Sequence, residues 1–235
     1  MKLPSLALAG SILTAAILAG AALGTRGGLW HFATGFQLLA VGLVVGLFML
    51  MVAIGTLVSA KHREQRPISV LSFIVVIAAL TLPIQGLIQA SKVPTIHDIS
   101  TDLADPPQFV AAAQLRTASE NPVAYAGEPV ASQQRESYPD IVPSYLPLSP
   151  HAAFEHALAI ARAMDWEIIA SDVQAGHIEA VETSRWFGFK DDIVIRIRAD
   201  GPVSRIDVRS KSRVGNNDLG VNAQRIRDYK ARLKG

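Results

Sequence analysis

The residues best suited to chemistry lie between Ser204 and Ile226, where a charged strand meets a Gly- and Asn-rich turn and a helix follows. Backbone N–H groups at a helix start, with arginine forks and hydroxyls nearby, can bind phosphate, sulfate or carboxylate. The sequence therefore predicts an anion site, to which we assign Arg196, Arg198, Arg209, Ser210, Ser212, Arg213, Asn216, Asp218 and Arg225.

The same residues also fit a purely structural arrangement. Asp218 would cap the helix and so occupy the N–H groups that an anion needs, and Gly215 would adopt a left-handed turn. The arginines would then pair with acidic side chains, for which the candidates are Asp191, Asp192 and Asp207. This alternative is favoured at the turn itself, because helix caps are more common than ligand sites.

A second group combines aromatic and acidic side chains just before a predicted strand. The aromatic rings could enter a bilayer interface or hold an apolar ligand, although such clusters more often pack as a hairpin corner. The two aspartates are adjacent, so they point to opposite sides of a strand and do not suit paired-carboxylate chemistry. The group consists of Trp186, Phe187, Phe189, Asp191 and Asp192, around Gly188.

Metal, nucleophile and cofactor sites are not indicated. His97, Asp98, Asp102 and Asp105 carry suitable ligand atoms, but the aspartates are ordinary turn and capping residues and the histidine stands alone. The chain has no cysteine and no G-x-S-x-G, H-E-x-x-H or P-loop motif. We therefore assign no catalytic residue, no metal and no cofactor.

These side chains must be positioned by an α+β domain that we expect over residues 91–235. Residues 91–115 are extended and acidic, and 116–150 form a Pro-rich segment whose apolar residues should hold it against the domain surface. Ser149 and Pro150 start a helix whose apolar stripe must cover a sheet. Two antiparallel hairpins and a closing helix are expected: strands 166–172, 177–184, 193–199 and 204–213, and helix 218–233.

Alternation along the last two strands predicts a sheet with two different faces. Ile193, Ile195, Ile197, Ile206 and Val208 fall on one face, which should lie under the helices. The other face carries nearly all of the charge, with Glu179 or Glu182 of the neighbouring strand as possible partners. Its residues are Arg196, Arg198, Arg205, Asp207, Arg209, Lys211 and Arg213.

Three apolar runs precede the domain, at about residues 3–24, 32–60 and 68–90, within a region that covers 1–90. Each is long enough to cross a bilayer as a helix, so the predicted fold is a membrane-anchored α+β protein: three transmembrane helices, then an antiparallel four-stranded sheet flanked by helices. The runs contain no Asp, Glu, Lys or Arg, which argues against ion transport. Hydrogen bonds between helices would satisfy Gln37 and Gln85.

The loop charges predict the orientation. Lys61, Arg63 and Arg66 crowd the second connection, whereas the first holds only Arg26, so the positive-inside rule places the second connection and the N-terminus in the cytoplasm. The chain is then a multi-pass protein of the inner (plasma) membrane with an extracytoplasmic domain. Alternatively the first run is a signal peptide cleaved near Ala21, which leaves the domain on the same side.

Three segments resemble one family. IHDIS-TD-PPQF begins near residue 96, WFGFKDDIVIRIR at Trp186, and SRIDVRSKSRVG-ND-G-NAQRI at Ser204. In this order they are similar to the family called domain of unknown function 1499, over about Pro94 to Leu233. The resemblance implies one compact domain that includes the Pro-rich segment. It implies no established activity and supplies no catalytic residues.

From these observations we expect a non-enzymatic membrane protein. Its domain would bind an anionic lipid headgroup or another envelope protein, and not nucleic acid. The domain holds 17 basic and 19 acidic residues, a net charge of −2, so any basic surface must be local. Two alternatives stay open: a hydrolase-like enzyme in which Asp191, Asp192 and Arg209 converge on a phosphate or carboxylate, and a purely structural subunit of a membrane complex.

Overall fold

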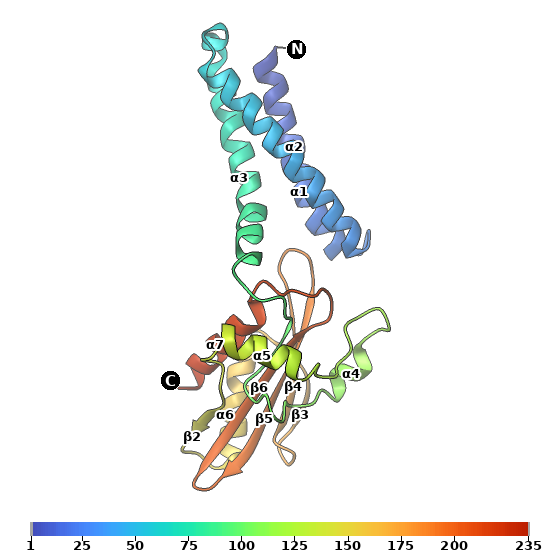
Figure 1. The fold of residues 1–235 in the computed structure, drawn as a ribbon, viewed down its shortest axis with the longest axis vertical. Coiled ribbons are helices and arrows are strands. Elements are labelled where there is room, and N and C mark those ends of the chain that lie inside the picture. Colours follow the sequence, from blue (N-terminus) through green and yellow to red (C-terminus); the bar gives the residue numbers. More distant parts are fainter. Residues whose placement is uncertain (1, 235) are drawn as a thin grey trace. The chain divides into compact units, whose positions relative to one another are not determined.

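The computed structural model describes residues 2–234 and divides into two compact units (Figure 1). The helical unit contains the residues up to Ser91 together with Arg185–Gly188, and the α+β unit contains the rest, from Lys92 onward.

The helical unit consists of α1 (Leu3–Arg26), α2 (Phe32–Val58), a short 3-10 helix η1 (Ala60–Gln65) and α3 (Arg66–Ala90). Among the described residues, three helices are long and apolar enough to cross a membrane. They pack through small residues: Gly42 lies against Leu18, and Gly46 against Thr14 and Leu80, so any larger side chain there would clash. Ser11 and Ser72 hydroxyls are 2.9 Å apart across the α1–α3 contact.

Pro83 lies inside α3, where the buried positions end with Leu80. The prediction that Gln37 and Gln85 form hydrogen bonds between helices is wrong. Both side chains are exposed, and neither has a hydrogen-bond partner in the described part of the chain. Their helix positions face away from the residues that pack α1, α2 and α3 together.

The α+β unit is built on one antiparallel sheet in the order β1-β6-β5-β4-β3, with β2 also paired to β6 (Figure 1). The sheet has six strands rather than the four expected. The four long strands are β3 (Glu167–Asp172), β4 (His177–Thr183), β5 (Lys190–Asp200) and β6 (Val203–Ser212). The two extra strands, β1 (Asp98–Ser100) and β2 (Ser144–Leu146), have three residues each, too few to display a period-2 pattern.

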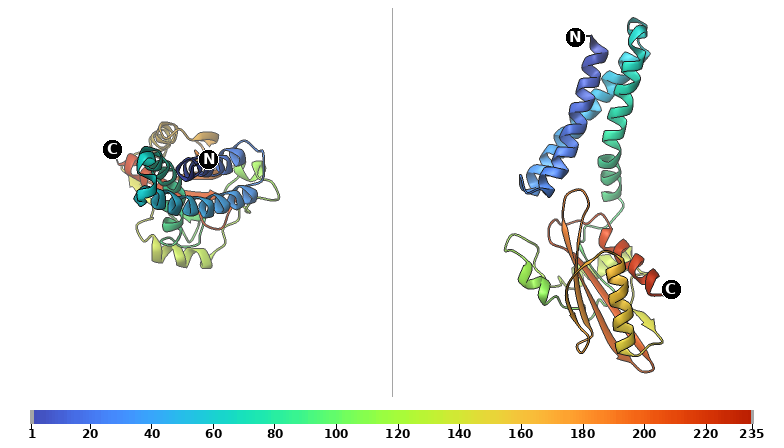
Figure 2. Two further views of the ribbon diagram at one scale, coloured as in Figure 1. Left: turned by 90° about the horizontal axis from the view of Figure 1, so that it is seen from above. Right: turned by 180° about the vertical axis from the view of Figure 1, so that it is seen from behind.

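Four helices accompany the sheet. α4 (Ala111–Leu115) and α5 (Glu128–Ser137) fall in segments expected to be irregular, while α6 (Pro150–Ala163) and α7 (Val221–Leu233) are the two expected helices. α7 begins three residues later than expected because Leu219 and Gly220 adopt left-handed φ angles of 58° and 80°. Figure 1 shows α5 on the near side of the sheet, and the rear view in Figure 2 shows α6 on its other side.

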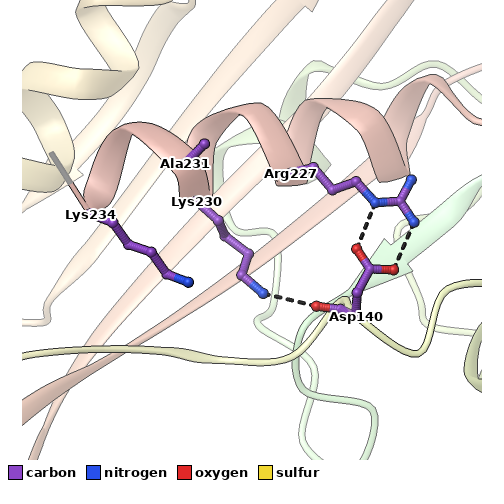
Figure 3. Close-up of a pocket in the computed structure, with 5 residues that line it drawn as sticks. All are labelled: Asp140, Arg227, Lys230, Ala231 and Lys234. Carbon is purple, nitrogen blue, oxygen red and sulfur yellow. Dashed lines mark hydrogen bonds and ion pairs between the residues drawn. The ribbon is translucent and has the colours of Figure 1, made fainter.

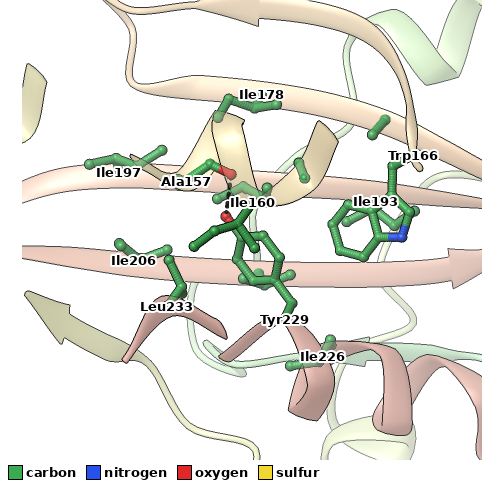
Figure 4. Packing of buried hydrophobic residues seen from close by; sticks show 14 of the residues in the cluster. Ala157, Ile160, Trp166, Ile178, Ile193, Ile197, Ile206, Ile226, Tyr229 and Leu233 are labelled. Atoms are coloured by element: carbon green, nitrogen blue, oxygen red, sulfur yellow. Dashed lines mark hydrogen bonds between the residues drawn. The ribbon is translucent and has the colours of Figure 1, made fainter. Parts of the chain in front are cut away.

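The apolar core lies between the sheet and the helices α6 and α7 (Figure 4). Ile193, Ile195 and Ile206 are fully buried there. Trp166 stacks on Tyr229 with ring centroids 5.3 Å apart, and the Tyr229 hydroxyl donates to the Ala157 carbonyl at 2.9 Å. This packing confirms the apolar face that alternation predicts on β5 and β6.

Candidate functional site

The charged face of the sheet is covered over most of its length, and only at one end is a side chain as exposed as that of Arg198, at 40%. Residues 98–125 cross it, and they place Phe109, Ala112 and Val123 against Val194 at its centre. We call the charged side chains on this face the buried ladder: Glu179, Asp192, Arg196, Arg198, Arg205, Asp207, Arg209, Lys211 and Arg213.

Arg209 is the centre of the buried ladder and has no exposed surface. Its guanidinium holds Asp98 with two parallel bonds, Nε to Oδ1 at 2.8 Å and Nη2 to Oδ2 at 2.9 Å. It also donates to the carbonyls of Pro107 and Val123 and lies between the rings of Phe109 and Tyr125. A guanidinium with this many partners is a structural group, because a ligand would have to displace them.

Lys211 shares the same carboxylate. Its Nζ lies 2.9 Å from Asp98 Oδ2 and 2.8 Å from the Ala124 carbonyl. Burial lowers the pKa of Lys211, and Asp98 partly opposes that shift. Burial also raises the pKa of Tyr125 to about 12, so its hydroxyl stays protonated.

Asp192 and Glu179 are the two acidic residues of the ladder that bind groups of residues 98–125. Arg116 Nε and Arg213 Nη2 both donate to Asp192 at 2.7 Å. The Glu179 carboxylate accepts hydrogen bonds from the N–H groups of Val110, Ala111 and Ala112 at 2.7–2.9 Å. It therefore satisfies the N–H groups at the start of α4. Both acids therefore tie the covering segment to the sheet.

The far end of the ladder is an ion-pair cluster of three arginines and three aspartates. Arg205 donates to Asp102 at 2.6 Å and to Asp207 at 3.0 Å. Arg196 and Arg198 contact Asp105 and Asp207 at 3.0–3.1 Å. Burial alone would raise the pKa of Asp102, but hydrogen bonds from backbone N–H groups and the charge of Arg205 hold it below its usual value.

A second polar network lies at one end of the apolar face. Arg225 of α7 donates to Asp191 Oδ2 at 2.7 Å and pairs with Glu182. Asn222 Oδ1 accepts a hydrogen bond from Ser210 Oγ at 2.6 Å. Asn222 Nδ2 donates to Ser212 Oγ and to the His97 carbonyl. Arg225, Ser210 and Ser212, assigned to an anion site from the sequence, are therefore joined through Asn222 of α7.

The turn before α7 uses its own side chain as a cap. The Asp218 carboxylate accepts hydrogen bonds from the N–H groups of Gly220 and Asn222 at 2.9 Å. Gly215 has a φ of +83°. Burial raises the pKa of Asp218. Asn216 is exposed, and burial lowers the pKa of the nearby His97. Whether an anion binds this turn stays a prediction.

The structure separates the residues that the enzymatic alternative requires together. Asp191 pairs with Arg225 on the apolar face, whereas Asp192 and Arg209 lie on the other face with different partners. At the aromatic corner, Ser184 and Phe189 exchange two hydrogen bonds around Gly188, and Trp186 is half exposed. In residues 2–234, no group of three or more His, Asp or Glu side chains is placed to hold a metal.

The three motif segments are thus joined by ion pairs: Asp98 with Arg209, Asp191 with Arg225, and Asp192 with Arg213. Residues 98–233, more than half of the chain, match the family model described as Protein of unknown function (DUF1499). The chain belongs to this family. No curated protein matches it. The match confirms the resemblance, and the charged motif residues Asp98, Asp192 and Arg209 of this DUF1499 domain lie in the buried contacts described above.

One accessible basic site was not assigned from the sequence. A cavity of about 280 Å³ lies between α7 and the loop after α5, lined by Asp140, Arg227, Lys230, Ala231 and Lys234 (Figure 3). The sequence places the three cations on the outer face of α7, but the loop that completes the site is more than 80 residues away. Only the folded chain brings Asp140 beneath them.

Proposed function

We propose that this DUF1499 protein is a non-enzymatic, multi-pass protein of the inner (plasma) membrane whose α+β domain lies outside the cytoplasm and binds a phosphate-bearing ligand at the α7 cavity. The main support is that three cationic side chains and a single carboxylate line this cavity. The cations of the buried ladder, in contrast, are already occupied by acidic side chains.

Free donors support the choice of the α7 cavity. Arg227 binds Asp140 through Nε and Nη2, at 2.6 and 2.7 Å, so Nη1 is left with no partner among the described residues. Lys230 donates to the carbonyls of Asp140 and Val142 and retains one N–H. Within residues 2–234, the ammonium group of Lys234 has no partner. These donors border one cavity (Figure 3).

Electrostatics also favours an anion there. Burial, and then the charge of Lys234, lower the pKa of Lys230, so the cations repel one another and a bound anion would relieve that repulsion. The negative end of the α7 dipole opposes an anion by about 0.3–1 kcal/mol. A single hydrogen bond between charged groups contributes about 1.5–3 kcal/mol, which is larger.

Membrane attachment supports a headgroup as the source of the phosphate. The connection between α3 and β1 spans only Ser91–His97. A tethered domain samples nearby bilayer lipids at high effective concentration, so a weak site suffices. Soluble phosphate esters carry the same chemistry, and the two sources require separate arms of the test.

The test uses the absence of cysteine in the chain. Full-length Ala231→Cys is labelled with an environment-sensitive dye and placed in nanodiscs of neutral lipid, or of neutral lipid with phosphatidylglycerol. Inorganic phosphate and glycerol phosphate are titrated in the neutral discs. A lipid site predicts a dye response to phosphatidylglycerol, while a soluble ligand predicts a response to glycerol phosphate only.

A paired variant gives the decisive comparison. Lys230→Gln with Lys234→Gln should weaken either response about tenfold, since at least one charge-assisted hydrogen bond is lost. Arg162→Gln with Lys190→Gln removes the same charge from exposed positions elsewhere and should change little. Equal effects of the two pairs, or no response to any anion, would overturn the proposal.

A further inference from the structure

A second polar cavity, of about 450 Å³, is formed by residues of the helical unit alone. Figure 1 shows the start of α1 and the turn between α2 and α3 at the same end of this unit. The cavity lies between these two segments and is larger than the α7 cavity. Its lining residues are Lys2, Leu3, Lys61, His62, Glu64 and Gln65.

Within residues 2–234, the charged side chains around this cavity are unpaired. Lys2, Lys61 and Glu64 are exposed, and their side chains form no hydrogen bond or ion pair with the described residues. Two lysines and one glutamate give the cavity a net charge of +1, before any protonation of His62. The ammonium donors are therefore free, unlike the guanidinium groups of the buried ladder.

Two helix starts add to the positive potential of the cavity. Lys2 is the N-cap residue of α1 and Gln65 is that of α3, and neither side chain caps its helix. The first turn of each helix contains no acidic residue. An uncapped helix start carries about half a positive charge. The helix dipoles therefore favour an anion here, whereas the end of α7 opposes one.

Gln65 shows that the protein alone does not satisfy the polar groups at this end of the helices. Its amide oxygen is buried and has no hydrogen-bond partner among the described residues. Buried polar atoms without a partner are uncommon, and an ordered water or ion is one usual explanation for them.

The position of the cavity along the helices points to a lipid. α1 and α3 both start beside it, and each belongs to a segment long and apolar enough to cross a bilayer. The cavity therefore lies where the hydrocarbon core ends and the headgroups begin. Leu3, which is 48% exposed, places apolar surface next to the charged groups. Basic pockets between membrane helices on the cytoplasmic side are typical sites for anionic headgroups.

We propose that this cavity binds an anionic phospholipid of the cytoplasmic leaflet, whose phosphate pairs with Lys2 and Lys61. A phosphate held by both lysines would link the start of α1 to the connection between α2 and α3. The inference rests on the membrane insertion and orientation proposed above. It does not depend on anion binding at α7, which involves the other unit.

Native mass spectrometry of the full chain in detergent tests the proposal, because it counts bound lipids directly. The protein carries Lys230→Gln and Lys234→Gln throughout, so that the α7 cavity does not contribute. It is titrated with phosphatidylglycerol, with zwitterionic phosphatidylcholine, and with glycerol phosphate as a soluble source of the same phosphate. One phosphatidylglycerol should bind more tightly than either of the other two.

A pair of variants separates the cavity from a general attraction to basic loops. Lys2→Gln with Lys61→Gln should weaken phosphatidylglycerol binding about tenfold or more, because each cation near an anionic headgroup contributes several-fold. Arg63→Gln with Arg66→Gln is the matched control. It removes the same charge from exposed residues of the same connection that do not line the cavity, and should weaken binding less than about threefold.

A selective loss in the lysine pair, together with preference for phosphatidylglycerol, supports the proposal. Equal losses in the two pairs would mean that the basic loop attracts lipid without a defined site, and would overturn it. Equal binding of phosphatidylglycerol and phosphatidylcholine would overturn the requirement for an anion. Binding of glycerol phosphate as tight as that of phosphatidylglycerol would overturn the choice of a lipid.

Discussion

The two faces of the sheet are built from the same strands but are stabilised by different means. Ile193, Ile195 and Ile206 on one face pack under α6 and α7. On the other face Asp192 and Arg209, from the same two strands, are buried with partners from residues 98–125. Apolar packing requires volume and shape, while each buried charge requires partners of opposite charge at particular positions.

The specificity of the fold resides in the charged face. A helix could shift along an isoleucine surface at modest cost, but the guanidinium of Arg209 donates both of its parallel hydrogen bonds to Asp98 only in one geometry. The segment 98–125 has little regular structure of its own, so the ion pairs determine how it lies on the sheet. The family motif, which supplies these charges, therefore identifies a structural element of the domain.

The largest expected effect comes from unpairing the buried ladder. Asp98→Ala leaves Arg209 and Lys211 buried without a carboxylate and should destabilise the α+β unit by about 3–5 kcal/mol. Arg209→Met should cost less, because Lys211 still neutralises Asp98 and the methionine still contacts Phe109 and Tyr125. Urea unfolding followed by Trp166 fluorescence, with Trp30 and Trp186 replaced by Phe, measures both. Equal costs would contradict the shared-carboxylate arrangement.

The apolar face should respond in a graded way. Ile206→Ala removes a fully buried side chain and should cost about 3 kcal/mol, whereas Ile206→Val should cost about 1 kcal/mol. The same unfolding assay applies. A cost for Ile206→Val as large as that of Asp98→Ala would show that the two faces do not differ in the way described.

Alternation and turn residues were sufficient to predict the four long strands, α6, α7 and the difference between the faces. The partner of Arg209 was not predictable, because Asp98 is 111 residues away and only three residues around it form a strand. Pairing of Arg213 with Asp192 was among the structural alternatives, since β5 and β6 form a hairpin and bring those residues close.

The Pro-rich segment 116–150 was harder to predict for a physical reason. Six prolines between Arg116 and Pro150 suggest irregular structure, yet Pro129 lies in the first turn of α5, where its missing N–H costs nothing. The α7 cavity was missed because its cations look like an ordinary solvated helix face. Asp140 and the loop carbonyls that shape it come from a distant part of the chain.

The smallest expected effect is a pH dependence of stability that the charged face has and the apolar face lacks. Burial alone would raise the pKa of Glu179, but hydrogen bonds from His177 and from the N–H groups of α4 hold it below its usual value. Stabilisation by Glu179 is therefore complete above about pH 5 and is lost as pH falls through the folded-state pKa. Glu179→Gln should cost about 1 kcal/mol at neutral pH.

That cost should shrink toward zero in acid, whereas the cost of Ile206→Ala should not depend on pH, because no titratable group is lost with the isoleucine. Unfolding of both variants between about pH 7 and pH 3 measures the contrast across the range in which a carboxylate titrates. The exposed Glu155→Gln is the control for a carboxylate without buried partners. A constant cost for Glu179→Gln across this range would mean that the carboxylate charge does not stabilise the start of α4.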